Sequence, residues 1–350
     1  MCTAKEISIW AKYYSGGLNR YLEQDLTGLL KTVTSSCDKS SVARKFDITY
    51  AYPITDPNQP KLQVAPGTFI TVYLDYQAAW YGFVHTREMN TQEQTVTFTA
   101  YDCLIYLLKS NVTYNFKKAV AESCIKKICT DLGVKYNNIP VTGVEITMLI
   151  QGESAYKAIM KILYEVSKKT GKKYIMYADN NQLSVMEKGS VIQDKVGEPD
   201  YPGEFTRYTP LSPSENMSGT TYKDTIESMI NRVRAYDDKG NYKGMVESSY
   251  NQKFYGTFQS TYTQEENKNW KAEAEKLLHG VDREITVDAL GDWRFRTGYA
   301  AFINAPYIEA LDKKVFYIDG DTHTWNLESG LYTMELNLNS ENTMDDVEAG

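Results

Sequence analysis

Alternating apolar residues near the end of the chain constrain the fold more than any other feature of the sequence. From Tyr332 to Leu338 every second residue is apolar, which is the period-2 pattern of a strand with one buried face. A shorter apolar run, Val315–Ile318, precedes it, and the turn-forming segments DGD and ESG lie between the two runs. Residues 315–338 therefore predict a long antiparallel hairpin that closes a β-domain. The hairpin carries no cluster of groups arranged for chemistry, which favours a structural role over an enzyme.

The bulk composition indicates a water-soluble protein of several domains. At 350 residues the chain is long enough for two or three domains, and 42% hydrophobic and 24% charged residues are typical of globular proteins. No apolar run approaches the roughly 20 residues that cross a bilayer, and the N-terminus lacks a signal-peptide pattern. We expect synthesis in the cytoplasm and no direct membrane insertion.

Charge, tyrosine and cysteine content narrow the function classes further. A net charge of −7 disfavours specific or general nucleic-acid binding, which relies on basic side chains. The 28 tyrosines suit half-buried sheet positions, and some of them suit protein or sugar contacts. The five cysteines make a disulfide framework implausible, and no histidine near them completes a zinc site, so we expect buried free thiols. These are Cys2, Cys37, Cys103, Cys124 and Cys129.

Three regions follow from the patterning. Residues 1–112 contain alternating strands at regular spacing and end in a short helix capped by Asp102, which predicts a small barrel or sandwich. Residues 113–205 predict an α/β insert with helices over 117–132 and 154–170, a hairpin over 173–187 and a linker rich in proline and glycine. Residues 206–350 return to β structure, with an inserted polar helix over 263–280.

The first and third regions share an order of features. Each runs through a glycine turn (Gly67, Gly298), an apolar strand, an aromatic-rich strand and a strongly alternating strand. The sequence therefore predicts two related β-domains that flank the α/β insert.

Candidate catalytic and metal-binding groups are few. The three histidines are His85, His279 and His323, and their spacing assembles no nucleophile–base set. His323 is the best single candidate, and we interpret it as a residue that fixes the hairpin by hydrogen bonding. The DGD segment lacks the rest of a calcium loop and is interpreted as a turn. Candidate carboxylates for glycoside hydrolysis are Glu153, Glu165 and Asp131, on a surface rich in lysine. We predict no catalytic, cofactor-binding or metal-binding residues.

One further group is basic. Lys168, Lys169, Lys172 and Lys173 gather where a predicted helix ends, and cations there oppose the negative end of the helix dipole. The alternative is a patch that binds anions.

Four segments together resemble a known family. They are 316–338 (FYIDGDTHTWNLESGLYTMELNL), 224–241 (DTIESMINRVRAYDDKGN), 154–185 (SAYKAIMKILYEVSKKTGKKYIMYADNNQLSV) and 95–110 (TVTFTAYDCLIYLLKS). In their order and coverage, the chain is similar to the baseplate hub proteins of contractile phage tails. The nearest subgroup is that of Gram-positive myophages, defective prophages and phage-tail-like bacteriocins.

The resemblance implies a mainly β, α+β fold with two tail-tube-like β-barrel domains and an α/β insert between them. It implies a homotrimer in the baseplate that joins the sixfold tail tube to the threefold spike, without enzymatic activity or cofactors. The implied partners are the tail tube protein, the spike or needle protein, baseplate wedge proteins and the tape-measure protein. A carbohydrate-binding or adhesin module and a cell-wall hydrolase are the alternatives.

Exposed-looking aromatic residues at matching points of the two β-regions are the candidate interface. They are Phe69, Tyr73, Tyr81, Tyr299, Phe302, Tyr317 and Trp325.

Overall fold

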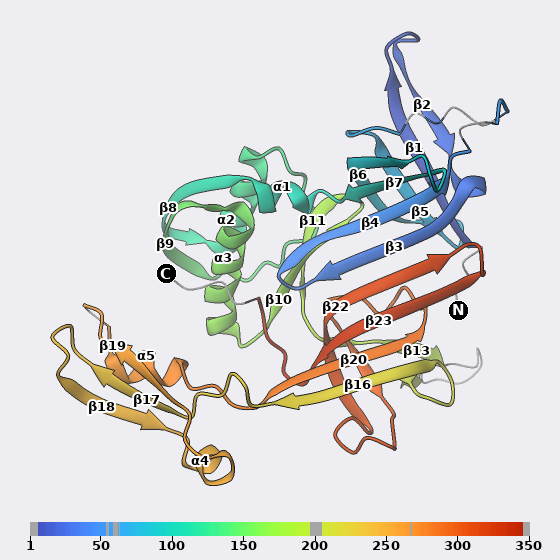
Figure 1. Ribbon diagram of the computed structural model, residues 1–350. Helices are drawn as coiled ribbons and strands as arrows, with labels where there is room; N and C mark the ends of the chain where they lie inside the picture. Colours follow the sequence, from blue (N-terminus) through green and yellow to red (C-terminus); the bar gives the residue numbers. More distant parts are fainter. Residues whose placement is uncertain are drawn as a thin grey trace. The chain divides into compact units, whose positions relative to one another are not determined.

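The computed structural model describes residues 6–53, 56–58, 62, 64–196, 205–266 and 268–345. Cys2 and part of the predicted linker, residues 197–204, lie outside them. The described chain is mainly β with few helices, as the sequence predicts (Figure 1). It divides into two compact units, unit 1 (1–220 with 286–350) and unit 2 (221–285). Among the described residues no helix has the length and apolar character needed to span a membrane.

Seven strands of unit 1 come from the first β-region. They are β1 (Ile7–Ser15), β2 (Arg20–Asp25), β3 (Leu30–Asp38), β4 (Ser41–Ala51), β5 (Phe69–Leu74), β6 (Gln77–Asn90) and β7 (Thr95–Tyr101), with a short 3-10 helix, η2 (Thr27–Leu29), before β3. They lie in the order β3-β4-β7-β6-β5-β1-β2. Alternate residues of β4, such as Phe46 and Ile48, are fully buried, as the period-2 pattern requires.

The closing β-region supplies a second group of strands. They are β16 (Met217–Thr225), β20 (Asp282–Leu290), β21 (Tyr299–Ile303), β22 (Lys314–Asn326) and β23 (Leu331–Asn339). Their order is β16-β20-β23-β22, with β21 also paired to β22. Because β22 pairs with β3, both groups lie in one sheet, which has 14 strands across the described residues when two short strands paired with β21 are included. The expectation of two closed barrels is therefore wrong for the described strands, which join edge to edge instead.

The predicted repeat is present in the strand order. In both groups a long strand pairs first with the strand before it and then with the strand after it: β6 with β5 and β7, β22 with β21 and β23. Each long strand has a bulge where the partner changes, between Val84 and Thr86 and between Ile318 and Gly320. We call β3–β7 the first repeat, and β16 with β20–β23 the second repeat.

The glycines that begin the repeats make the same contact. Gly67, with φ of 89°, donates its N–H to Val84 O at 2.8 Å, and Gly298, with φ of 98°, donates to Ile318 O at 3.0 Å. Positive φ explains why glycine stands at both turns.

The predicted closing hairpin is correct, but its turn is shorter than expected. The DGD segment lies inside β22, where Asp319 is the bulge residue, so DGD is not a turn. The chain reverses only at residues 327–330, between β22 and β23. Carboxylate and glycine residues serve a bulge as well as a turn, which is why the sequence pattern did not separate the two.

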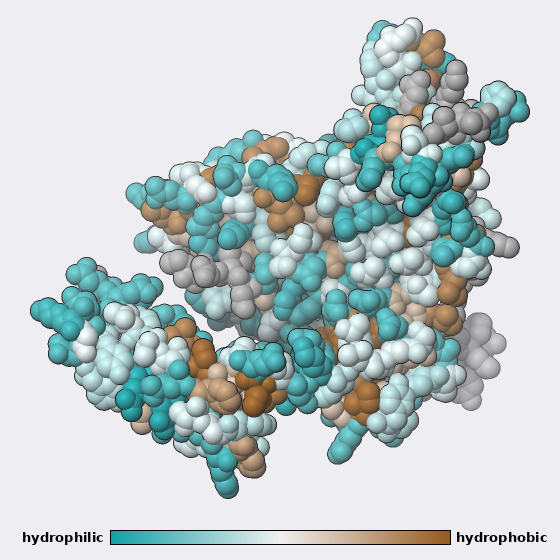
Figure 2. All heavy atoms as spheres, in the orientation of Figure 1, coloured by the Kyte–Doolittle hydropathy of each residue, from teal (hydrophilic) through white to brown (hydrophobic). Residues whose placement is uncertain are grey.

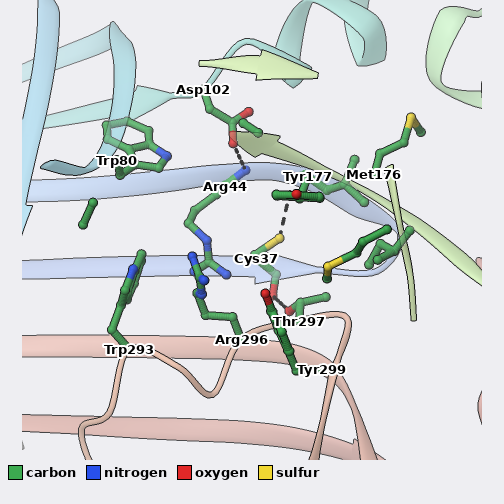
Figure 3. A pocket seen from close by; sticks show the side chains of 15 residues that line it. Cys37, Arg44, Trp80, Asp102, Met176, Tyr177, Trp293, Arg296, Thr297 and Tyr299 are labelled. Atoms are coloured by element: carbon green, nitrogen blue, oxygen red, sulfur yellow. Dashed lines mark hydrogen bonds between the residues drawn. The ribbon is translucent and has the colours of Figure 1, made fainter. Parts of the chain in front are cut away.

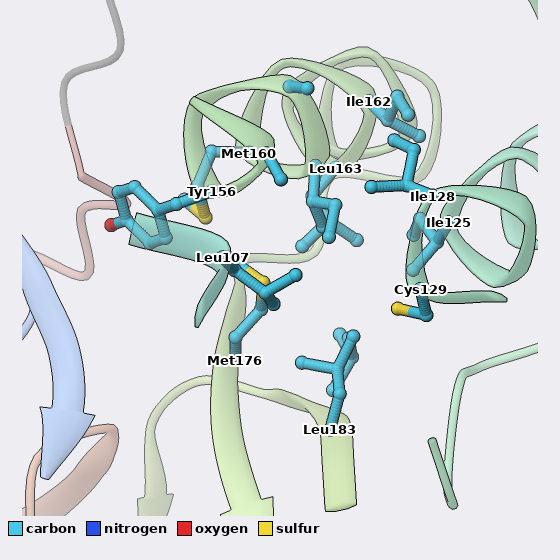
Figure 4. Close-up of a cluster of buried hydrophobic side chains, with 14 of the residues drawn as sticks. Leu107, Ile125, Ile128, Cys129, Tyr156, Met160, Ile162, Leu163, Met176 and Leu183 are labelled. Carbon is cyan, nitrogen blue, oxygen red and sulfur yellow. The ribbon is translucent and has the colours of Figure 1, made fainter. Parts of the chain in front are cut away.

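The α/β insert forms its own core beside the sheet (Figure 4). Its elements are α1 (Leu104–Lys109), β8 (Asn111–Val120), α2 (Ala121–Asp131), β9 (Glu145–Ser154), α3 (Ala155–Thr170), β10 (Tyr174–Asp179) and β11 (Gln182–Glu187). Ser154 caps α3 by accepting from Lys157 N, and Gly171 ends it with φ of 75°. The helix predicted from 117 begins only at Ala121, because the preceding residues pair with β9.

Short strands follow the insert. They are β12 (Ser190–Val191), β13 (Gln193–Val196), β14 (Phe205–Tyr208) and β15 (Pro210–Leu211). Two of them, β12 and β15, pair in parallel with β21, so part of the predicted linker crosses the second repeat.

Unit 2 is a small α+β structure. Its elements are β17 (Arg232–Tyr236), β18 (Tyr242–Glu247), α4 (Ser249–Tyr255), β19 (Gln259–Thr263) and α5 (Trp270–Lys276). Val233, Val246 and Ala274 form its core, with Trp270 packed against them. The helix predicted over 263–280 is only α5, because Thr263 ends β19 and Asn269 provides the cap.

Candidate functional site

Several buried polar side chains bond to one another where the two repeats join. Here β3 pairs antiparallel with β22, from Asp38 opposite Gly320 to Thr32 opposite Asn326. We call this pairing the seam. The two strands come from opposite ends of the sequence, and Figure 1 shows them side by side.

A buried ion pair lies at the seam. Arg44 Nη1 and Nη2 donate to the two carboxylate oxygens of Asp321 at 2.6 and 2.7 Å. Thr297 adds its N–H at 2.6 Å and its hydroxyl at 2.7 Å to Oδ1 of the same carboxylate. Burial alone would raise the pKa of Asp321, but the guanidinium beside it outweighs burial and lowers the pKa to about 2. The pair is therefore ionised at neutral pH and holds the two repeats together.

His323 is fixed by two hydrogen bonds in the same layer. Its Nε2 donates to Phe295 O at 2.9 Å, so Nδ1 accepts from the Tyr332 hydroxyl at 2.8 Å. The ring is fully buried, and burial lowers the pKa of His323 to about 4. The predicted role in fixing the hairpin by hydrogen bonds agrees with these contacts, although His323 lies within β22.

The cavity beside the ion pair is too small for a substrate. Its volume is about 50 Å³, whereas pockets for small molecules typically measure roughly 300–1,000 Å³. Figure 3 shows Arg44, Asp102 and Thr297 around it, with Trp80 and Trp293 at one side. Burial raises the pKa of Asp102 to about 7, and its carboxylate accepts the backbone N–H groups of Arg44 and Leu104. The Asp102 carboxylate and the Arg44 guanidinium are thus both engaged in hydrogen bonds within the fold.

The other candidate carboxylates are also paired. Glu153 binds Lys161 at 2.7 Å, and Glu165 binds Lys168 at 2.7 Å. Asp131 accepts from Lys127 at 3.0 Å. The pairs of Glu165 and Asp131 lie at the surface, and the pair of Glu153 with Lys161 is half-buried.

The described residues also contain no group of three or more histidine, cysteine or acidic side chains that could hold a metal ion. Of the DGD carboxylates, Asp319 binds Lys39 at 2.6 Å, and its other oxygen binds Lys188. Asp321 belongs to the seam. The four described cysteines are free thiols; Cys103, Cys124 and Cys129 are buried and Cys37 is half-buried.

The structure separates the predicted interface residues into two groups. Trp325 is fully buried on the core face of β22, stacked on Tyr332 with ring centroids 4.5 Å apart, so it leaves the candidate interface. The alternation of β22 puts it on the face of His323, and that signal was present in the sequence. The others are half-buried: Phe69, Tyr73, Tyr81, Tyr299, Phe302 and Tyr317.

Phe69 and Tyr81 lie together at one solvent-open hollow of about 510 Å³. Their rings stack with centroids 6.0 Å apart. On the face shown in Figure 2, hydrophobic residues form small groups among hydrophilic ones. No local pattern in the sequence marks Arg44 as a functional residue, because its partner Asp321 lies in the last hairpin.

The chain is similar to a known protein family and to two proteins of a bacterium. Residues 33–339 match the family described as YqbQ-like. The chain is 29% identical over 264 residues to the phage-like element PBSX protein XkdQ of Bacillus subtilis, which covers 72% of this chain and 75% of that protein. It is 27% identical over 276 residues to the uncharacterized protein YqbQ of the same bacterium, covering 76% of this chain and 78% of YqbQ.

A similar fold occurs in the crystal structure of a 43 kDa tail protein of the prophage MuSo2 from Shewanella oneidensis. The TM-score is 0.65 and the match covers 97% of this chain and 100% of the other, at 14% sequence identity. At this identity the likeness speaks for the fold alone.

Proposed function

This chain belongs to the YqbQ-like family of phage tail and baseplate proteins, and we propose that it is the hub of a contractile-tail baseplate. In this role three copies form a ring that joins the sixfold tail tube to the threefold spike or needle. Baseplate wedge proteins bind from outside, and the tape-measure protein lies within. The protein is made in the bacterial cytoplasm and becomes part of the phage tail or tail-like particle.

The internal repeat is the observation that carries this proposal. A component between a sixfold and a threefold partner can meet both through symmetric contacts if three subunits offer six similar surfaces. One chain with two repeats in the same strand order meets that requirement. The division into a first tube-like region (1–112), an insert (113–205) and a second tube-like region (206–350) belongs to the same proposal.

A non-enzymatic role fits the polar groups of the seam. Hydrogen bonds to neighbours in the fold engage the side chains of Arg44, Asp321 and His323. Such a network rigidifies a joint between two β-structures.

Mass and symmetry test the proposal. We expect light scattering on the purified protein, alone or with its tube and spike neighbours, to give about 120 kDa for the ring, three times the 39.9 kDa chain. A density map of the intact tail should show the symmetry change from six to three at this protein. A monomer under all these conditions, together with absence of the protein from purified tails, would refute the hub.

Exposed aromatic residues of unit 2 favour one alternative, a carbohydrate-binding module. Tyr250 and Phe254 on α4 are 72% and 61% exposed, with ring centroids 4.9 Å apart. Adjacent exposed rings are suited to stacking on sugars. Saturable binding on a glycan array that is lost in Tyr250→Ala and Phe254→Ala would favour this function, and a peptidoglycan zymogram tests for hydrolase activity.

A further inference from the structure

A positively charged side chain without a partner lines the cavity beside the seam. The guanidinium of Arg296 comes from the segment between β20 and β21, and it makes no hydrogen bond or ion pair with any residue of the described chain. Its Nε atom is fully buried. Buried polar atoms nearly always have a hydrogen-bond partner, and burying an ionised group without one is costly. The Arg296 guanidinium therefore requires an acceptor that the described chain does not supply.

A second guanidinium lies next to the first. Arg44 and Arg296 both approach the ring of Trp293, with their central guanidinium carbons 5.1 and 5.2 Å from its centroid. Figure 3 shows the two arginine side chains ending close together beside this ring. Burial and the repulsion from Arg44 lower the pKa of Arg296 from its usual value. Two like charges thus lie beside one aromatic ring, where each destabilises the other unless a negative charge is near.

The carboxylate of Asp321 balances only the charge of Arg44. Arg44 bonds to both of its oxygens, and Thr297 bonds to Oδ1 through its backbone N–H and its hydroxyl. Both oxygens of Asp321 are thus engaged by groups other than Arg296. The second positive charge is left without a directly bound counter-charge.

The remaining groups around the cavity do not restore the balance. The titratable side chains of the described chain that line it are Cys37, Arg44, Asp102, Tyr177, Arg296 and Tyr299. Thiol and phenol groups are uncharged near neutral pH, and burial raises the pKa of the Cys37 thiol to about 12. Asp102 is the one acid among these lining groups, and burial raises its pKa to about 7. It carries a full negative charge only above neutral pH, so an excess of positive charge remains.

The size of the cavity selects the kind of ligand. Its volume of about 50 Å³ exceeds the roughly 10–15 Å³ that one water requires and lies far below the roughly 300 Å³ of the smallest pockets for organic ligands. A monatomic ion therefore fits, whereas a nucleotide or a sugar phosphate does not. Two guanidinium groups repel a cation and attract an anion.

We propose that this cavity binds a monatomic anion, namely chloride, through the guanidinium of Arg296. The ion supplies the negative charge that Arg296 lacks and accepts from its N–H groups. Because residues of β6, of β10 and of the segment before β21 line the cavity, the ion ties the two repeats and the insert together at one point. This inference concerns the single chain and does not rest on the hub proposal.

Chloride dependence of stability tests the site. A ligand that binds only the native state raises stability as its concentration passes its Kd. Replacing sodium gluconate by sodium chloride at constant ionic strength should therefore raise the midpoint of thermal unfolding by about 2–4 °C, once chloride exceeds its Kd about tenfold. Sodium bromide should act in the same way, because bromide has the same charge and a similar size.

Two arginine variants assign the effect to one side chain. Arg296→Met removes the charge and the donors, so its midpoint should not respond to chloride. In gluconate this variant should be at least as stable as wild type, because it lacks the uncompensated buried cation. Arg294→Met is the matched control, since Arg294 is an exposed arginine two residues away that pairs with Asp292. It should respond to chloride as wild type does, and an equal response of Arg296→Met would overturn the proposal.

A third variant tests Asp102 as the rival counter-charge. If Asp102 neutralised Arg296, wild type would not respond to chloride and Asp102→Asn alone would respond, which would overturn the proposal. If chloride fills this role, wild type responds and Asp102→Asn responds at a several-fold lower chloride concentration, because the competing negative charge is gone.

Bromide locates the ion directly. Crystals of the wild-type chain grown with bromide should give an anomalous scattering peak in the cavity, at hydrogen-bond distance from the Arg296 guanidinium. Peaks confined to the molecular surface would overturn the site, and this result needs no variant to fold. Neither measurement depends on the mass of the assembly, so a chain that stays monomeric would refute the hub and leave the anion site intact.

Discussion

Removing the cation at the seam should be among the most damaging single changes in the sheet. In Arg44→Met the carboxylate of Asp321 stays buried and loses the two hydrogen bonds of 2.6 and 2.7 Å. A pKa of about 2, against 3.8 for an ordinary aspartate, corresponds to about 2–3 kcal/mol in favour of the ionised form. Adding the cost of an unpaired buried charge, we expect the free energy of unfolding to fall by about 3–5 kcal/mol.

A double-mutant cycle isolates this pair. Asp321→Asn keeps an acceptor for Thr297 but removes the charge, so the double variant with Arg44→Met should recover at least about 2 kcal/mol relative to the sum of the single variants. Urea denaturation followed by tryptophan fluorescence measures all four proteins, since Trp293 and Trp325 lie beside the pair.

An exposed pair provides the reference value. Glu165→Gln breaks the surface contact with Lys168 and should cost less than about 0.5 kcal/mol. Additive single effects, or a loss below about 1 kcal/mol in Arg44→Met, would refute the view that the seam depends on this ion pair.

Three further predictions concern pH, packing and capping. The native pKa of His323 is about 4, so on acidification from about pH 6.5 to 4 the unfolded state takes up the proton first and stability falls. The native pKa of Asp102 is about 7, so in nearly the same pH range the native state takes up the proton first and stability rises. Asp102→Asn removes the second effect, so thermal denaturation should show a steeper loss on acidification than in wild type; equal slopes would contradict this assignment. Gly82→Ala places a Cβ 2.5 Å from Tyr101 O, so the free energy of unfolding from urea titrations should fall by about 1–3 kcal/mol. An unchanged midpoint would contradict a tight contact between β6 and β7 at this position. Ser154→Ala removes the cap of α3 and should cost about 1 kcal/mol, with Ser154→Asp as the variant that restores it.

Local patterns in the sequence predicted the strands well. The alternation from Tyr332 to Leu338 indicated a half-buried strand, and β23 has that pattern of burial. The glycine turns at Gly67 and Gly298 marked the start of equivalent segments, because few other residues adopt a positive φ there.

What the sequence did not reveal is the way distant segments meet. Arg44 and Asp321 lie 277 residues apart, and no periodicity within one strand indicates which strand will pair with it. The helix expected from residue 117 failed for a related reason. Ala119 and Val120 pair with Ile146 and Glu145 of β9, and the bulge before them continues the strand, so tertiary pairing overrides helical propensity.

The turn between the first two strands of each repeat has a consequence for how this chain diversifies. The first repeat passes from β3 to β4 through Lys39 and Ser40 alone, whereas residues 226–281, with β17, β18, α4, β19 and α5, separate β16 from β20 in the second repeat. This segment is thus an insertion in the chain between two strands that are neighbours in the sheet. A cassette attached in this way can be shortened, lengthened or exchanged between lineages while the ladders beneath it keep their register.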